Sequence, residues 1–328
     1  MAKNPLSSLV RPSTRSWIQE AKQTPDFSLF DLLHGYVYAR WPYLYIGIGT
    51  GEHPLAKKLA PVIQRIGWLI TRTAGRSKAR PGGSAQPQGN QGTVTFADTY
   101  HGKVVPLDAA RQLVRVNEPL RVPDLEHIIP YSRARAIVLH NPDHIVALDC
   151  PCRASRANPC LPLDVCLIVG EPFASFVVEH HPQRSRWITP GEAEDILRAE
   201  DERGHVHHAF FKDAMLGRFY AICNCCACCC GAMQAQRSGT PMLASSGYVA
   251  QVDEQECIGC ANCVSYCQFG ALSNDGQVTR VDPALCMGCG ICLSKCEQGA
   301  LSLRREESKG EPLEIFTLME QATPQAIP

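Results

Sequence analysis

Two similar stretches in the C-terminal part of the chain decide the fold: CIGCANCVSYCQFGAL at residues 257–272 and CMGCGICLSKCEQGAL at residues 286–301. Each stretch spaces its four cysteines as C-x2-C-x2-C-x3-C, so the segment is an internal repeat. A short run with strand character precedes each copy, at residues 248–252 and 278–281. The repeat therefore predicts two small units in which a strand leads into a cysteine-bearing loop.

The cysteine spacing suits iron–sulfur chemistry. Three closely spaced thiolates on a tight loop can hold three corners of one iron–sulfur cube, while the fourth, one helical turn later, points away and reaches another cube. Gly259, Gly288 and Gly290 lie inside the loops and let backbone amides approach the sulfurs. Structural zinc sites usually use two C-x2-C pairs with a longer spacer, so the spacing disfavours zinc in this repeat.

Residues of about 246–305 resemble a bacterial-type ferredoxin domain that carries two [4Fe-4S] clusters. The resemblance implies a pseudo-twofold arrangement of β-α-β repeats and one-electron transfer. It implies that one cluster is bound by Cys257, Cys260, Cys263 and Cys296. It implies that the other is bound by Cys286, Cys289, Cys292 and Cys267. The proline that commonly follows the fourth cysteine of this family is Gln268 in one copy and Glu297 in the other.

Ten of the eighteen cysteines lie upstream of this repeat, and none lies before residue 150. These candidate ligands are Cys150, Cys152, Cys160, Cys166, Cys223, Cys225, Cys226, Cys228, Cys229 and Cys230. Neighbouring side chains in a helix or strand diverge, so the run at 223–230 is either irregular or serves more than one site. The number of thiols allows one or two further [4Fe-4S] clusters, or one larger or non-cubane cluster held by more than four cysteines. Zinc, a mixed site and metal-free dithiol chemistry are the alternatives.

Most of residues 95–305 resemble a group of cysteine-rich bacterial ferredoxin-like iron–sulfur proteins. The shared features are C-x-C-R at 150–153, C-N-C-C-x-C-C-C at 223–230 and the C-terminal two-cluster domain. Cys229-Cys230-Gly231 also resembles the cysteine–cysteine–glycine element of heterodisulfide reductases, in which non-cubane clusters act on disulfides.

The rest of the sequence predicts an α+β protein with five parts. We expect a helical N-terminal region at 1–75, a flexible linker rich in Gly, Pro, Ser and Gln at 76–95, and a mixed α/β cysteine-rich domain at 96–245. The ferredoxin domain at 246–305 and a polar tail at 306–328 follow. Within the mixed domain, strands are expected at 136–140 and 144–149, and a helix capped by Thr189 after that residue. His205, His207 and His208 suggest a solvated turn with one core histidine, or else a metal ligand or proton donor.

Composition narrows the functional classes. Lys+Arg and Asp+Glu are equal at 32 each, which gives no electrostatic case for nucleic-acid binding. No apolar stretch near the start is long enough to span a bilayer, and no signal peptide is evident, so we expect a cytoplasmic protein whose cysteines bind metal. An aromatic patch at residues 36–45 is expected to pack internally, with peripheral membrane contact or partner docking as the alternative.

The main hypothesis is therefore an iron–sulfur electron-transfer protein of anaerobic metabolism. It would carry two [4Fe-4S] clusters in the ferredoxin domain and at least one further cluster upstream. Its partners would be a redox protein donor and acceptor, so that it serves as a component of an oxidoreductase system rather than as a stand-alone enzyme. One alternative is a reductase with an active-site cluster formed by residues 150–166 and 223–230. Another is a zinc-stabilised scaffold with an attached ferredoxin.

Overall fold

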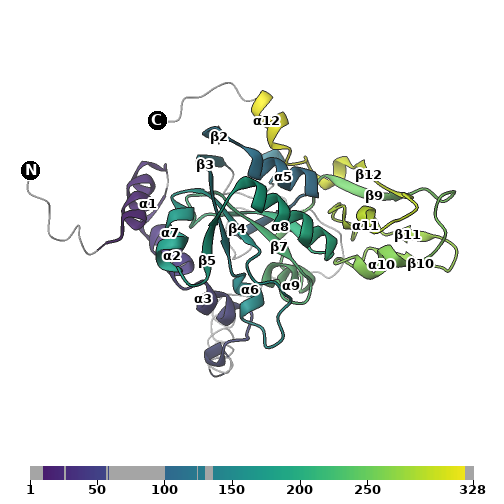
Figure 1. The fold of residues 1–328 in the computed structure, drawn as a ribbon, viewed down its shortest axis with the longest axis horizontal. Helices are drawn as coiled ribbons and strands as arrows, with labels where there is room; N and C mark the ends of the chain where they lie inside the picture. The colour runs from purple at the N-terminus through teal and green to yellow at the C-terminus, as the bar shows by residue number, and fades with distance from the viewer. Residues whose placement is uncertain are drawn as a thin grey trace, which may run out of the picture.

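A mixed sheet of eight strands occupies the middle of the molecule, between N-terminal helices at one end and two small sheets of the cysteine repeat at the other (Figure 1). The structure is a computed structural model that describes residues 10–25, 27–56, 58, 100–123, 125–129 and 136–321. The predicted linker at 76–95 lies outside the described residues, as do 59–75 and 322–328.

The large sheet has the strand order β2-β3-β4-β7-β6-β1-β8, with β5 also paired to β3. The strands are β1 (Tyr100–Val104), β2 (Leu120–Val122), β3 (Ile137–Leu148), β4 (Cys166–Glu171), β5 (Ser185–Ile188), β6 (Val206–Lys212), β7 (Arg218–Cys225) and β8 (Leu243–Ala244). Every pairing is antiparallel except that of β1 with β8. The two strands expected at 136–140 and 144–149 form the single strand β3, whose register with β4 shifts between His140 and Ile145.

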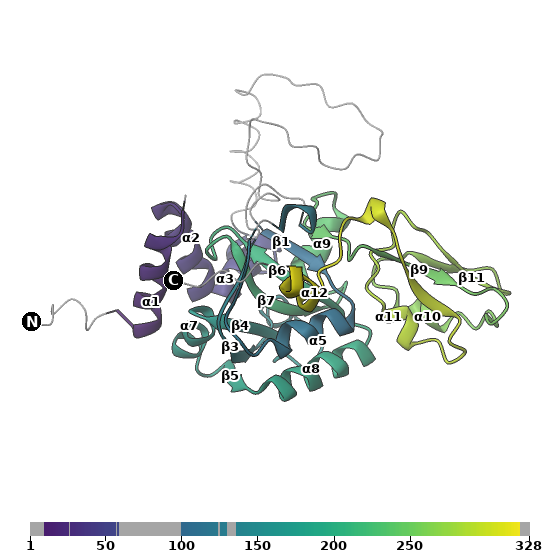
Figure 2. The same ribbon diagram turned by 90° about the horizontal axis from the view of Figure 1, so that it is seen from above.

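Each face of this sheet is buried in its own hydrophobic core. Along β3, Ile145 and Ala147 belong to one core, whereas Val146 and Leu148 belong to the other, as the alternation of side chains in a strand requires. Helices α5 (Leu107–Arg115) and α8 (Pro190–Glu202) lie side by side on the first face (Figure 2). Thr189 caps α8 in a reciprocal capping box with Glu192, so the predicted helix is confirmed.

The second face is covered by α7 (Phe173–His180) and by the N-terminal helices. These are α1 (Pro12–Gln23), α2 (Leu29–Arg40) and α3 (Pro42–Gly49), so the described part of the N-terminal region is helical as predicted. Trp17 of α1 packs edge-on against Phe173 and Phe176, with ring centroids 5.3 and 5.0 Å away. No helix in the described ranges is both long and apolar enough to cross a membrane.

The cysteine repeat forms two β-α-β units. The first consists of β9 (Tyr248–Val252), α10 (Asn262–Tyr266) and β10 (Leu272–Asn274), and the second of β11 (Thr279–Val281), α11 (Ile291–Ser294) and β12 (Leu301–Arg305). β9 pairs with β12 and β10 pairs with β11, both antiparallel, so each small sheet takes one strand from each copy. The strands predicted before each cysteine loop are confirmed as β9 and β11.

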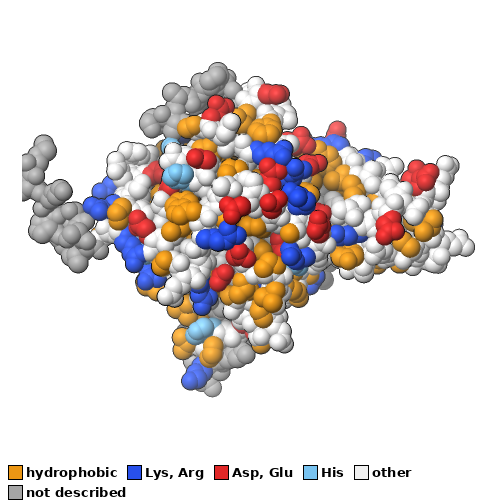
Figure 3. Space-filling model, in the orientation of Figure 1, with side chains coloured by type: hydrophobic (Ala, Val, Ile, Leu, Met, Phe, Trp, Pro, Cys, Tyr) orange, Lys and Arg blue, Asp and Glu red, His pale blue; other side chains and the backbone are white. Residues whose placement is uncertain are grey.

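Two expectations need correction. His205, His207 and His208 do not form a solvated turn, because all three are buried and the last two lie on the central strand β6. Residues 306–321 are not merely a polar tail: Leu313 and Ile315 return to the first core, and α12 (Ile315–Gln321) contacts α5 and β2. The apolar side chains that pack there, Leu313, Ile315, Leu318 and Met319, lie within seven residues, which is too short a span for a strong helical pattern in sequence. On the face seen in Figure 3, acidic and basic side chains are interspersed rather than gathered into a basic patch.

Candidate metal centres

Two cavities lie inside the repeat, and each is lined by four cysteines. We call the first the outer site; its cysteines are Cys257, Cys260, Cys263 and Cys296. We call the second the inner site; its cysteines are Cys267, Cys286, Cys289 and Cys292. Each cavity thus takes three cysteines from one copy and the fourth from the other, which are the two sets of four that the family resemblance implies.

The cysteine loops depend on glycine at two points of close approach. Gly259 and Gly288 have positive φ values of 66° and 64°, which side chains other than glycine rarely adopt. A Cβ on Gly288 would lie 2.2 Å from the carbonyl oxygen of Tyr248, and one on Gly259 would lie 2.5 Å from that of Gln277. The glycines therefore let each loop turn tightly against the neighbouring strand or turn.

Backbone amides point at sulfurs in both sites. Ala271 N–H donates to Cys267 Sγ at 3.2 Å, and Ala250 N–H donates to Cys286 Sγ at 3.4 Å. In the outer site, the N–H of Thr279 donates to Cys257 Sγ at 3.5 Å, and this bond lowers the pKa of the Cys257 thiol. Burial raises the pKa of Cys289 to about 12, so metal binding there must displace a proton from a thiol that otherwise holds it.

The two sites differ in exposure. At the outer site Cys260 is exposed, and the neighbouring Ile258 keeps 66% of its surface accessible. At the inner site Cys289 packs with Val104 of β1 and Val206 of β6, both fully buried. The outer site therefore faces solvent, and the inner site faces the large sheet.

Gln268 connects the inner site to the upstream cysteines. Its side-chain oxygen accepts a hydrogen bond from Ala227 N–H at 2.9 Å, and its side-chain nitrogen donates to Gly204 O at 2.9 Å. Its own carbonyl oxygen accepts from Arg237 at 2.9 Å. Since Gln268 directly follows Cys267, the chain that carries an inner-site cysteine is bonded to the middle of the run at 223–230.

The ten upstream cysteines separate into two groups. Four of them bring their sulfurs within 4.8 Å of one another; we call this set the four-thiol group, and it consists of Cys160, Cys226, Cys228 and Cys229. The shortest sulfur–sulfur distances are 3.2 Å between Cys160 and Cys228 and 3.7 Å between Cys228 and Cys229. Four converging thiols of this kind could hold a metal ion.

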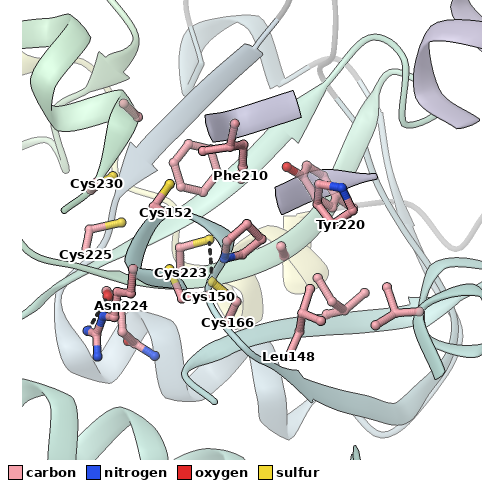
Figure 4. Close-up of a pocket in the computed structure, with 18 of the residues that line it drawn as sticks. Leu148, Cys150, Cys152, Cys166, Phe210, Tyr220, Cys223, Asn224, Cys225 and Cys230 are labelled. Carbon is pink, nitrogen blue, oxygen red and sulfur yellow. Dashed lines mark hydrogen bonds between the residues drawn. The ribbon is translucent and has the colours of Figure 1, made fainter. Parts of the chain in front are cut away.

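The other six form a closed ring, which we call the six-thiol ring. Each thiol interacts with the next in the order Cys150, Cys152, Cys230, Cys225, Cys223, Cys166 and back to Cys150. The sulfurs of Cys166 and Cys223 are 3.8 Å apart. Figure 4 shows the six side chains grouped along one side of a cavity, coming from different parts of the chain.

Strand pairing accounts for half of this ring. Cys166 on β4 and Cys223 on β7 are direct partners in the antiparallel register, so their side chains stand next to each other on one face. Cys225 is two residues beyond Cys223 and shares that face. Cys150 and Cys152 follow β3 at the start of α6 (Pro151–Ala154), and Cys230 precedes α9 (Gly231–Arg237).

Arg153 holds the loops around the ring in place. Its guanidinium is buried and bonded to Glu200 at 2.5 Å, to the carbonyl oxygen of Asn224 at 2.9 Å and to that of Pro162 at 2.6 Å. Burial opposes the charge of Glu200, but hydrogen bonds from His205 and Arg153 outweigh it and keep the pKa of Glu200 below its usual value. The guanidinium of Arg153 is therefore paired with a carboxylate beside the ring.

The three histidines expected as possible ligands line none of the four cysteine sites among the described residues. His207 instead bonds through Nδ1 to the side-chain oxygen of Asn224 at 2.6 Å. Sequence reasoning missed Gln268 and Asn224 as positioning residues, because their partners lie 41 and 17 residues away.

Comparison with known families agrees with this geometry. Residues 250–273 and residues 279–302 each match the model of the 4Fe-4S binding domain. The chain therefore carries two 4Fe-4S binding motifs in its C-terminal part. No curated protein matches the chain.

Proposed function

We propose that this chain is an iron–sulfur electron-transfer protein. Two [4Fe-4S] clusters would occupy the outer and inner sites, in a two-cluster ferredoxin fold whose β-α-β copies are related by a pseudo-twofold axis. The observation that supports this most is that each of the two cavities is lined by three cysteines of one copy and one of the other. Bound clusters would supply one-electron transfer at iron.

The protein groups around the clusters would tune that transfer. The amides of Ala271, Ala250 and Thr279 donate to cysteine sulfurs and so offset part of the negative charge on each centre. This stabilises the reduced form and raises the reduction potential. The apolar contacts of Cys289 with Val104 and Val206 keep water away from the inner site.

The difference in solvent exposure between the outer and inner sites supports an order in which electrons pass through them. A redox partner would exchange electrons at the outer site, where Cys260 is exposed, and the inner site would pass them toward the upstream cysteines through the contact at Gln268. The ten upstream cysteines would hold at least one further metal centre. We propose the same domain boundaries as the sequence predicts, with the cysteine-rich domain at 96–245 and the ferredoxin domain at 246–305.

The four-thiol group supports a structural role for one metal ion. A tetrahedral zinc with Zn–S bonds of about 2.3 Å places its sulfurs about 3.8 Å apart. The four thiols lie within 4.8 Å of one another, whereas the thiolates of a cubane sit on four separate irons and are farther apart. A single zinc ion here would hold the loop containing Cys160 against the run at 226–229. The distances between these four thiols therefore favour one part of the zinc-scaffold alternative, a structural zinc site upstream of the repeat.

A reductase is the second candidate function, and one observation favours it. The six-thiol ring borders an apolar cavity lined by aromatic side chains that include Tyr38, Phe210 and Tyr220. Reoxidation of the reduced protein by a small disulfide, with two thiols formed for every two electrons consumed, would support this function. A reduced protein that is inert to disulfides would leave electron transfer as the only role.

The electron-transfer proposal is tested by metal content. The full chain, purified without oxygen, is compared with the variant Cys263→Ser/Cys292→Ser, which removes one ligand from each site. We expect the variant to lose about eight irons and about eight inorganic sulfides relative to the parent chain. The matched control is Ser265→Ala/Ser294→Ala, which changes exposed residues on the same two helices and should keep both. Retention of all iron by the cysteine variant would refute the proposal.

A further inference from the structure

The six-thiol ring shares no cysteine with the four-thiol group, although Cys226 and Cys229 of that group also line the cavity beside the ring. The members of the ring come from three places in the fold: the turn after β3, the paired ends of β4 and β7, and the residue before α9. We infer that these six thiolates together hold one iron–sulfur cluster of more than four irons. The inference rests on the proposed iron–sulfur function and identifies the upstream centre that this function needs.

The arrangement of sulfurs argues against a single metal ion. Around one ion, four thiols must all lie close to one another, as they do in the four-thiol group. The six sulfurs of the ring are more spread out, because the described residues contain no second set of three or more potential ligands within that mutual distance. A ring of this form surrounds a space rather than a point.

The number of thiols argues against a single cubane. Each of the four irons of a cubane takes one thiolate, so four cysteines saturate it, as in the outer and inner sites. Six thiols that close a ring exceed this number by two. The spare pair cannot be assigned to the four-thiol group, whose four members are already complete. More than four irons give every thiol of the ring a metal to bind.

Because the ring is buried, it can hold thiolates only if an opposing positive charge accompanies them. Cys150, Cys166, Cys225 and Cys230 are buried within the second hydrophobic core. Six thiolates packed in such surroundings would be very unstable without an opposing positive charge. The nearby cation Arg153 is paired with Glu200 and so supplies little net charge. A polynuclear iron core supplies the missing positive charge.

The backbone is also prepared for anionic sulfurs. The N–H groups of Arg153, Gly231 and Met233 interact with the thiols of Cys150, Cys152 and Cys230, respectively. Hydrogen bonds of this kind favour the thiolate form. A cavity of about 80 Å³ adjoins the ring. That space equals about five to eight water positions, so a group of several atoms has room beside the ring.

The test isolates the ring from the ferredoxin sites in the full chain. Cys263→Ser/Cys292→Ser removes the proposed ferredoxin clusters and leaves the ring intact. Iron, zinc and inorganic sulfide are then counted after anaerobic purification. Inorganic sulfide is present only in iron–sulfur clusters, so a single metal ion in the four-thiol group does not contribute to the sulfide count. We expect more than four irons to remain, together with inorganic sulfide.

A second pair of variants assigns this remaining iron. Adding Cys166→Ser/Cys225→Ser to the same background should remove it together with its sulfide, whereas adding Cys160→Ser should leave the sulfide unchanged. Four remaining irons would overturn the inference of a cluster with more than four irons; no remaining sulfide would overturn the cluster itself.

Failure of the ferredoxin proposal gives a different pattern. In that case the parent chain and the Cys263→Ser/Cys292→Ser variant would contain equal iron. Misfolding of the ring variant is excluded by building Cys166→Ser/Cys225→Ser in the parent chain as well. There the ferredoxin irons, about eight, should persist.

Discussion

Gln268 occupies the position that the ferredoxin pattern usually gives to proline, one residue after Cys267. A proline could not provide the side-chain amide that bonds both Ala227 N–H and Gly204 O. The departure from the family pattern, visible in sequence, thus has a structural reason. It joins the repeat to the loop that carries the upstream cysteines.

Replacing this side chain should loosen the junction. Gln268→Ala removes two hydrogen bonds, each worth about 1 kcal/mol, so we expect hydrogen exchange at the amide of Ala227 to accelerate by about tenfold or more. Glu297→Ala is the matched control, since Glu297 is the exposed residue at the equivalent position of the second copy. Equal exchange rates in Gln268→Ala and the parent chain would contradict the role assigned to Gln268.

Single residues also show what sequence could and could not reveal. The two sets of four cysteines that the family resemblance implies are the sets that line the outer and inner cavities, and the sequence motif is enough to name them. The division of the upstream cysteines into four and six was not predictable. It depends on pairing across the sheet, such as that of Cys166 with Cys223, and no local pattern encodes such a register.

The element α12 lies at the end of the described chain and closes the first core. Its first residue, Ile315, is fully buried, and α12 contacts α5 and β2. The polar composition of 306–328 hid this contact, because the apolar side chains that pack on the core there are Leu313, Ile315, Leu318 and Met319, all within seven residues. Helices with a long amphipathic pattern and a cap, such as α8, were by contrast predictable.

The packing of α12 can be measured with two neighbouring residues. Ile315→Ala should lower the free energy of unfolding by about 2–5 kcal/mol, because it leaves a cavity in the core. Phe316→Ala is the control: Phe316 is 40% exposed and its truncation should cost much less. Chemical denaturation under anaerobic conditions measures both. A similar cost for the two variants would show that α12 does not close the core.

At the scale of the whole molecule, the cysteine repeat lies at one end of the large sheet (Figure 1), and its two sites differ in exposure. The outer site is exposed, the inner site packs against β1 and β6, and the run at 223–230 follows across the bond to Gln268. The mixed α/β fold and the helical N-terminal part were predictable from composition and pattern. Their arrangement around the six-thiol ring was not, because it depends on contacts between distant segments.

The most direct test of electron transfer is low-temperature EPR of the full chain, purified without oxygen and chemically reduced. We predict signals of two magnetically coupled, reduced [4Fe-4S] clusters, since the two cavities adjoin the same β-α-β pair. These signals should disappear in Cys263→Ser/Cys292→Ser and persist in Ser265→Ala/Ser294→Ala. A reduced parent chain that contains iron and sulfide but shows no [4Fe-4S] signal, or a signal unchanged in the cysteine variant, would contradict the account.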